Sequence, residues 1–99
     1  MRKNPGDRRR EILNCGIKIA KKCGYKKITM QKVSKKLGIS PPLMHHYFNN
    51  VEELKNEIIK EALENGIVEI IAQLMVFKDA RVNNISDTTK KQAIDFISS

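Results

Sequence analysis

Apolar residues recur at steps of three and four along most of the chain, the spacing that places them on one face of an α-helix. From Arg8 to Cys23 the apolar positions include Ile12 and Ile19, and Gly24 is the expected end of this first helix. No segment alternates apolar and polar residues as a half-buried strand does. The sequence therefore predicts an all-α fold.

Two short helices separated by a tight turn are predicted next. Thr29 is the expected N-cap of a helix over 30–37, and Ser40 is the expected N-cap of a helix over 41–48. Hydroxyl side chains suit these positions because they accept hydrogen bonds from the first N–H groups of a helix. Gly38 lies between the two helices and can adopt the positive φ that a sharp turn needs.

Asn50 and Glu53 resemble a capping box for a helix over 51–65. The following helix, over 67–78, is apolar on most of its circumference. That is more apolar surface than the core of one small monomer needs, so we expect a subunit interface there. The predicted interface residues are Ile67, Ile70, Ile71, Leu74, Met75 and Phe77.

The remaining residues are predicted to form a loop and a last helix. The loop covers 79–85, and Ser86 or Asp87 is the expected cap of a short helix that carries Ile94 and Ile97.

The pair of helices around Gly38 has the properties of a helix-turn-helix. Such a pair needs a small residue where the helices nearly touch, which Ser34 supplies, and apolar residues on the facing sides. The apolar set is Val33, Leu37, Ile39, Met44 and Phe48. This pattern predicts a DNA-binding motif, and a plain helical hairpin within a bundle is the alternative.

Charge is unevenly distributed between the two halves of the chain. Residues 1–50 carry 13 Lys and Arg against two acidic residues, a net charge of +11, whereas residues 51–99 have a net charge of −3. We therefore predict a DNA-binding head over 1–50, with a basic arm at its start, and connecting and dimerisation helices over 51–99. A solvated lysine-rich surface is the alternative explanation of the charge.

The helix over 41–48 is expected to enter the major groove of duplex DNA, because its exposed side chains precede the inward Met44 and Phe48. The predicted base contacts are Pro42, Leu43, His45, His46 and Tyr47, although Tyr47 can instead pack against the first helix. The predicted phosphate contacts are Lys26, Lys27, Thr29, Gln31, Lys32, Ser40, Arg8 and Arg9, and Arg2 and Lys3 of the arm can reach the backbone or the minor groove.

The stretch from Arg8 to Leu54 resembles the N-terminal domain of TetR-family transcriptional regulators. The resemblance is carried by short motifs in a fixed order: Ile12-Leu13, Gly24-Tyr25 before Thr29, Val33-Ser34, Leu37-Gly38-Ile39-Ser40, His46-Tyr47-Phe48 and Glu52-Glu53-Leu54. It implies a three-helix DNA-binding head, a fourth helix that links the head to a dimerisation region, and a homodimer that represses transcription at palindromic operators.

The chain departs from the family pattern at two contact positions and in length. His45 stands where the family commonly has Tyr, and Val51 stands where it commonly has a phosphate-binding Lys, so Lys55 is a candidate replacement. Only 33 residues follow Gly66, whereas family members carry a long C-terminal region around an inducer pocket. We therefore expect no small-molecule ligand.

Other functions fit the sequence less well. The charge also suits a non-specific or architectural DNA-binding protein, and the apolar helix suits a protein that heterodimerises with a full-length regulator. We expect no enzyme activity, because no candidate base stands near a nucleophile, and no cofactor. We expect a cytoplasmic protein, because the chain shows no membrane span and no secretion signal.

The two cysteines are predicted to be structural. Cys15 and Cys23 lie too far apart on one helix for a disulfide, and both are expected to be small core or half-buried residues. A metal site that joins them to His45 and His46 is the alternative, but no C-x-x-C pair is present and neighbouring histidines on a helix diverge, so no metal is expected.

Overall fold

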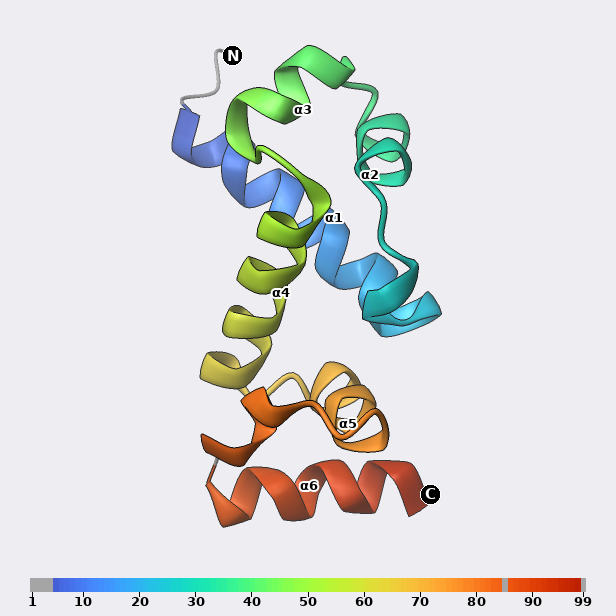
Figure 1. Ribbon diagram of the computed structural model, residues 1–99, viewed down its shortest axis with the longest axis vertical. Coiled ribbons are helices and arrows are strands. Elements are labelled where there is room, and N and C mark those ends of the chain that lie inside the picture. Colours follow the sequence, from blue (N-terminus) through green and yellow to red (C-terminus); the bar gives the residue numbers. More distant parts are fainter. Residues whose placement is uncertain (1–4, 85, 99) are drawn as a thin grey trace. The chain divides into compact units, whose positions relative to one another are not determined.

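The computed structural model describes residues 5–84 and 86–98, and every regular element within them is helical (Figure 1). The predicted all-α fold is confirmed. The elements in chain order are α1 (Pro5–Cys23), the 3₁₀ helix η1 (Tyr25–Lys27), α2 (Met30–Leu37), α3 (Pro41–Tyr47), α4 (Val51–Asn65), α5 (Val68–Val76), the 3₁₀ helix η2 (Ala80–Asn84) and α6 (Asp87–Ser98). Among these helices, none has the length and hydropathy to cross a membrane.

The chain divides into two compact units, which we call the N-terminal unit, up to Ile58, and the C-terminal unit, from Ile59. The division falls inside α4, eight residues after the boundary expected at residue 50. Leu54 and Ile58 explain the difference, because both lie near Gly16 of α1 and both are fully buried. A Cβ atom at Gly16 would stand 2.5 Å from Cδ1 of Ile58, so glycine permits this close approach.

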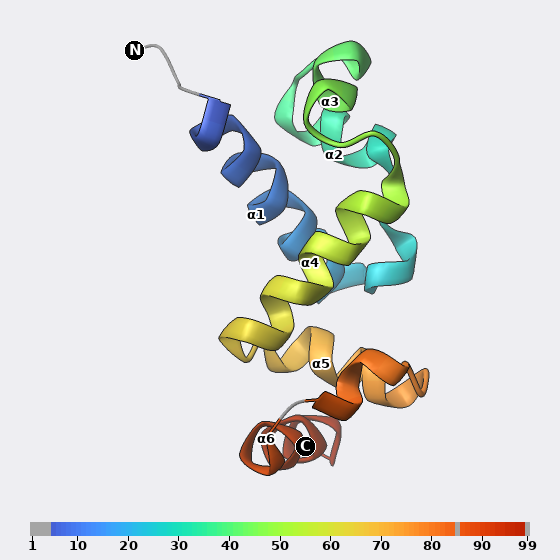
Figure 2. The same ribbon diagram turned by 60° about the vertical axis from the view of Figure 1, so that its left-hand side comes forward.

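The helix-turn-helix forms as predicted, with α2 and α3 joined by a tight turn (Figures 1 and 2). Gly38 adopts the left-handed conformation, with φ of 69°, and the Ile39 N–H donates to the Ser34 carbonyl at 3.0 Å. Ser34 is buried between the helices, as are Val33 and Met44. Glycine suits the turn because a left-handed conformation is strained for residues with a Cβ atom.

The predicted helix caps are also confirmed. The Thr29 Oγ1 accepts the Lys32 N–H at 3.0 Å, and the Ser40 Oγ accepts the Leu43 N–H at 3.3 Å. Asn50 caps α4 through its Oδ1, at 2.9 Å from the Glu53 nitrogen. Ser86 caps α6. Each cap satisfies a backbone donor that the helix itself leaves without a partner.

The ends of the chain depart from the predicted elements in two places. The helix α1 begins at Pro5, three residues before the predicted start, because proline is well tolerated in the first turn of a helix. Ala80–Asn84 form η2, where a loop was predicted. Arg81 stabilises the start of η2, since its backbone and guanidinium N–H groups donate to the Asp79 carboxylate. The predicted arm contacts of Arg2 and Lys3 lie outside the described residues.

The C-terminal unit pairs α5 with α6 (Figures 1 and 2). Ile70, Ile71 and Leu74 are completely buried within the chain itself, so they have no surface to offer a partner, and this part of the predicted interface does not fit the structure. The helix α6 packs along α5 and covers part of its apolar surface. Ile67 and Met75 are half-buried, and Phe77 is exposed.

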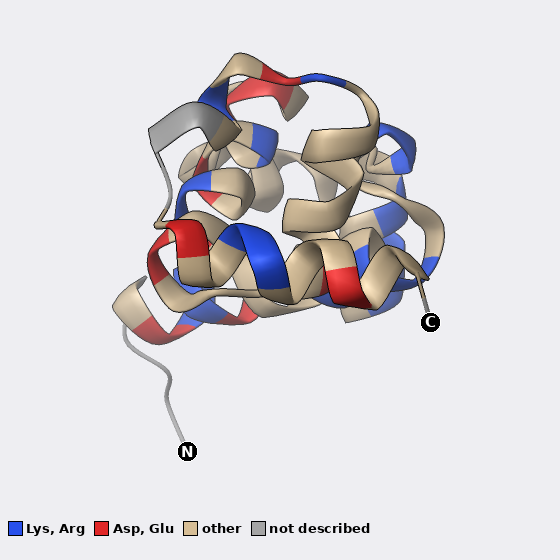
Figure 3. Ribbon diagram, turned by 90° about the horizontal axis from the view of Figure 1, so that it is seen from below, with Lys and Arg blue, Asp and Glu red and all other residues tan. Residues whose placement is uncertain are grey.

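The helix α6 buries a small residue and exposes its large apolar side chains. Ala93 is its buried residue, whereas Ile94 and Ile97 are each about half exposed. Its charged residues, Asp87, Lys90, Lys91 and Asp95, balance in sign along the helix that runs to the C label in Figure 3. The helix α6 therefore has no net charge and exposes apolar side chains to solvent.

Candidate nucleic-acid interface

The helix α3 is anchored on one side and exposed on the other. Met44 and Phe48 lie at its buried edge, where 1% and 0% of their surface is exposed to solvent. Of the predicted base contacts, Pro42, His45 and His46 are exposed, whereas Leu43 and Tyr47 are half-buried. The rings of His46 and Tyr47 meet edge to face, with centroids 5.1 Å apart. The structure therefore brings the five predicted residues together on one short helix with its outer edge open to solvent.

Phe48 is covered by an arginine that sequence reasoning assigned to phosphate binding. The Arg9 guanidinium lies 5.0 Å from the Phe48 ring centroid, and its Nη2 is 3.5 Å from Oε2 of Glu57. Arg8 pairs with Glu11, with Nη1 and Oε1 3.6 Å apart. Both arginines thus have acidic partners within the N-terminal unit, which lowers the net positive charge that each presents to a phosphate.

A basic cluster forms around the start of α2, which we define as Lys26, Lys27, Thr29 and Lys32. The Lys32 ammonium donates to the Lys27 carbonyl at 3.0 Å, which ties η1 to the first turn of α2. The Thr29 hydroxyl oxygen accepts the cap hydrogen bond, and a hydroxyl has in addition one proton to donate. The Lys32 ammonium and the Thr29 hydroxyl therefore lie at the positive end of a helix, and the exposed Lys26 and Lys27 precede them in η1.

The start of α4 carries Val51, one of the two positions that depart from the family pattern, and Lys55, its candidate replacement in phosphate binding. Val51 is half-buried, and Lys55 has a side chain that is 19% exposed, with its Nζ 3.9 Å from Oε1 of Glu52. The Lys55 charge is therefore largely withdrawn from solvent and faces a carboxylate, a poorer arrangement for phosphate than that of the basic cluster.

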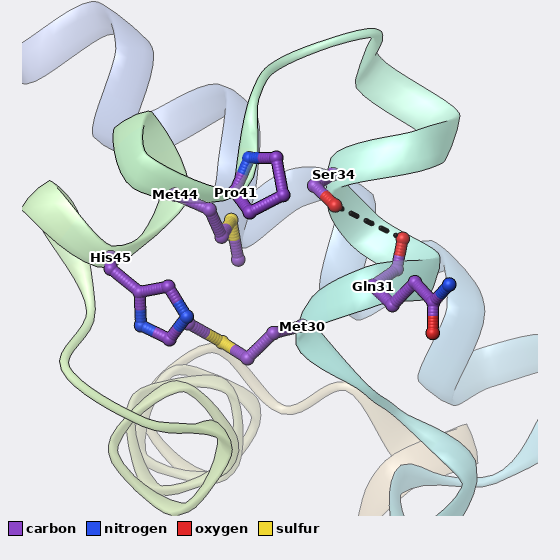
Figure 4. A pocket seen from close by; sticks show the side chains of 6 residues that line it. All are labelled: Met30, Gln31, Ser34, Pro41, Met44 and His45. Carbon is purple, nitrogen blue, oxygen red and sulfur yellow. Dashed lines mark hydrogen bonds between the residues drawn. The ribbon is translucent and has the colours of Figure 1, made fainter.

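A cavity of about 300 Å³ lies between α2 and α3 (Figure 4). It is lined by Met30, Gln31, Ser34, Pro41, Met44 and His45. Sequence reasoning gave no role to Met30. The available signal was its place one helical turn before Ser34, the small residue at which the two helices meet.

The cysteines and histidines do not form a metal site among the residues that the structure describes. Burial raises the pKa of the Cys15 thiol above its usual value, while Lys36 and Lys18 act in the opposite direction. A buried, protonated thiol is a core group, as predicted for Cys15. The prediction for Cys23 was wrong, because Cys23 is exposed on the last turn of α1.

Comparison with known proteins relates part of the chain to a family. Residues 12–58 match the family model described as bacterial regulatory proteins of the tetR family. This segment, 47 of the 99 residues, is therefore similar to the TetR family. The match contains α2, the Gly38 turn, α3 and the first half of α4, so this matched segment coincides with the N-terminal unit except for its first eleven residues.

A curated relative is similar to part of the chain. It is the HTH-type transcriptional regulator BetI of Rhizobium meliloti (strain 1021), which is 30% identical over 56 residues. The aligned part covers 57% of this chain and 28% of that regulator, so the likeness concerns less than a third of the relative. No solved structure gave a significant match.

Proposed function

We propose that this chain is a TetR-family transcriptional repressor that binds duplex DNA sequence-specifically, as a homodimer, at inverted-repeat operators. The observation that carries the proposal is α3: its inner edge is fixed by Met44 and Phe48, and its outer edge is exposed at the basic end of the chain. A short, rigidly anchored helix of this kind fits the major groove. Occupation of a promoter by such a protein excludes the transcription machinery.

The exposed edge of α3 offers two kinds of base contact. The rings of His46 and Tyr47 support each other and carry polar atoms that can hydrogen-bond to base edges. Pro42 and Leu43, one turn earlier, offer apolar contacts. His45 is less available, because its Nδ1 is 3.2 Å from the Asn49 carbonyl oxygen.

Phosphate contacts are assigned chiefly to the basic cluster. Its three lysines are exposed and flank the Thr29 hydroxyl in the chain at the start of α2, where the helix dipole also favours an anion. Ser40, at the start of α3, carries a second hydroxyl in a capping position. Arg8, Arg9 and Lys55 contribute less, because each has a carboxylate neighbour.

The C-terminal unit supports a homodimer. Large apolar side chains there have about half or more of their surface exposed: Val76, Phe77, Ile94, Phe96 and Ile97. Clustered exposed apolar residues are typical of protein interfaces, and like copies bind most simply through one shared patch. A dimer must hold its two recognition helices about 34 Å apart to reach successive major grooves, which favours an inverted-repeat operator.

We expect the double substitution Ile94→Glu with Ile97→Glu to convert the dimer into a monomer at micromolar concentration, because it adds two charges to the apolar surface. Sedimentation equilibrium measures the change, and duplex affinity should fall with it. Thr88→Glu with Gln92→Glu adds the same charges to exposed polar positions of α6 and should leave the dimer intact. A wild-type monomer, with or without duplex, would contradict the proposed dimer.

Selection of bound duplexes from a random pool tests the function directly. The expected consensus consists of two inverted half-sites, and the selected duplex should bind about a thousandfold or more tightly than unrelated duplex of equal length. Absence of any consensus would refute sequence-specific binding.

A non-specific DNA-binding protein is the second candidate, and the net charge of +11 on the first 50 residues favours it. In that case unrelated duplex would compete equally with the selected one.

A further inference from the structure

The cavity between α2 and α3 has an apolar interior and an open rim. Met44 is almost completely buried at its base, Met30 is half-buried, and Pro41 is exposed at its edge. Figure 4 shows the Met30 thioether extending across the cavity toward the His45 ring. The apolar lining that a bound group would meet therefore comes from Met30 and Pro41, with Met44 beneath them.

The polar groups around the cavity have partners within the chain. The Ser34 hydroxyl donates to the Gln31 carbonyl at 3.1 Å, and His45 Nδ1 faces the Asn49 carbonyl oxygen at 3.2 Å. The Gln31 side-chain amide points away from Met30 and Pro41 in Figure 4. No Lys, Arg, Asp or Glu lines the cavity. These features suit an apolar group rather than a phosphate.

Duplex DNA displays one apolar group on its base edges in the major groove, the C5 methyl of thymine. Pro41 and His45 lie one turn apart on α3, on the flank of the helix that faces α2. Pro41 and His45 are both exposed, so a groove that receives α3 can meet this rim of the cavity as well as the outer edge of the helix. Thioethers are deformable and polarisable, so they can close around a small apolar group.

We propose that this cavity seats a thymine methyl group and that Met30 determines specificity at that position of each half-site. The inference rests on the proposed function, since it needs α3 in the major groove. It assigns a role in base recognition to α2 as well as to α3. It also separates the cavity from Pro42, which is exposed, and Leu43, which is half-buried, because neither lines the cavity.

Replacement of thymine by deoxyuridine tests the proposal, because it removes only the methyl group. In the duplex obtained by selection, each thymine is replaced in turn, and affinity is measured by fluorescence anisotropy. We expect one position per half-site at which the replacement weakens binding about fourfold, the effect of one buried methyl, and about 15-fold when both half-sites are changed.

The variant Met30→Ala identifies the residue that reads this methyl group. Its affinities for the thymine and deoxyuridine duplexes should be equal within error at that position, whereas wild type distinguishes them. Leu63→Ala, at a half-buried leucine of α4 outside the cavity, should retain the wild-type discrimination. Circular dichroism checks that both variants remain helical.

Three results would overturn the proposal. Deoxyuridine without effect at every position would exclude a methyl contact. Discrimination that persists in Met30→Ala but disappears in Leu43→Ala would assign the methyl to the outer edge of α3. If no duplex is selected at all, the proposed function and this inference both fail, whereas the first two results leave the proposed function standing.

Discussion

Replacing Phe48 by alanine is expected to lower the free energy of unfolding by about 3–5 kcal/mol, the usual cost of removing a fully buried aromatic ring. Phe48 has no exposed surface, and the Arg9 guanidinium that covers it would lose its ring contact. A small domain has only about 5–15 kcal/mol in total, so the loss is a large fraction of stability. Urea denaturation, followed by circular dichroism, measures the shift in midpoint.

The same substitution at an exposed ring provides the comparison. Phe77 is 50% exposed, and Phe77→Ala is expected to cost about 1 kcal/mol or less. Measurement at two protein concentrations separates any contribution from self-association, since only that contribution depends on concentration. Phe48→Leu, with a smaller expected loss, keeps the comparison possible if the alanine variant does not fold. Equal losses at Phe48 and Phe77 would show that the α3 anchor is not formed.

Raising monovalent salt from 50 to 200 mM is expected to weaken binding to the selected duplex about 10⁴-fold. The estimate assumes that a dimer neutralises about eight phosphates, which gives a slope near −7 for the logarithm of affinity against the logarithm of salt concentration. Binding titrations at four or more salt concentrations measure this slope.

The basic cluster should account for much of that slope. Lys26→Gln with Lys27→Gln removes four positive charges per dimer, so the slope should fall by about 3.5. Lys90→Gln with Lys91→Gln removes the same charge from α6 and should leave the slope unchanged. If both pairs of substitutions change the slope equally, the net charge rather than the basic cluster governs the salt dependence.

The helix-turn-helix was predictable because its signals are local. Thr29 and Ser40 accept hydrogen bonds from residues three positions later, and Gly38 adopts its left-handed conformation within a turn of a few residues. Such interactions need no distant partner, so residue type and spacing suffice to locate them. The same holds for Asn50 at the start of α4.

The roles of the arginines and of Met30 were not predictable in this way. Arg9 meets Glu57 and Phe48, which lie about 40 to 50 positions later in the chain, and only folding brings these three residues together. Met30 lines a cavity with residues of α3, the next helix. From sequence alone, Arg9 is one of three adjacent arginines and Met30 is one apolar residue at a helix start.

The sequence by itself determined where α2, α3 and α4 begin, where the chain turns at Gly38, and which half carries the positive charge. Tertiary structure decided which apolar residues remain exposed: α6 packs along α5, Ile70 and Leu74 are buried, and Ile94 and Ile97 face solvent. The reason is physical. A cap or a turn is satisfied by neighbours in the chain, whereas burial depends on which distant helix arrives to cover a face.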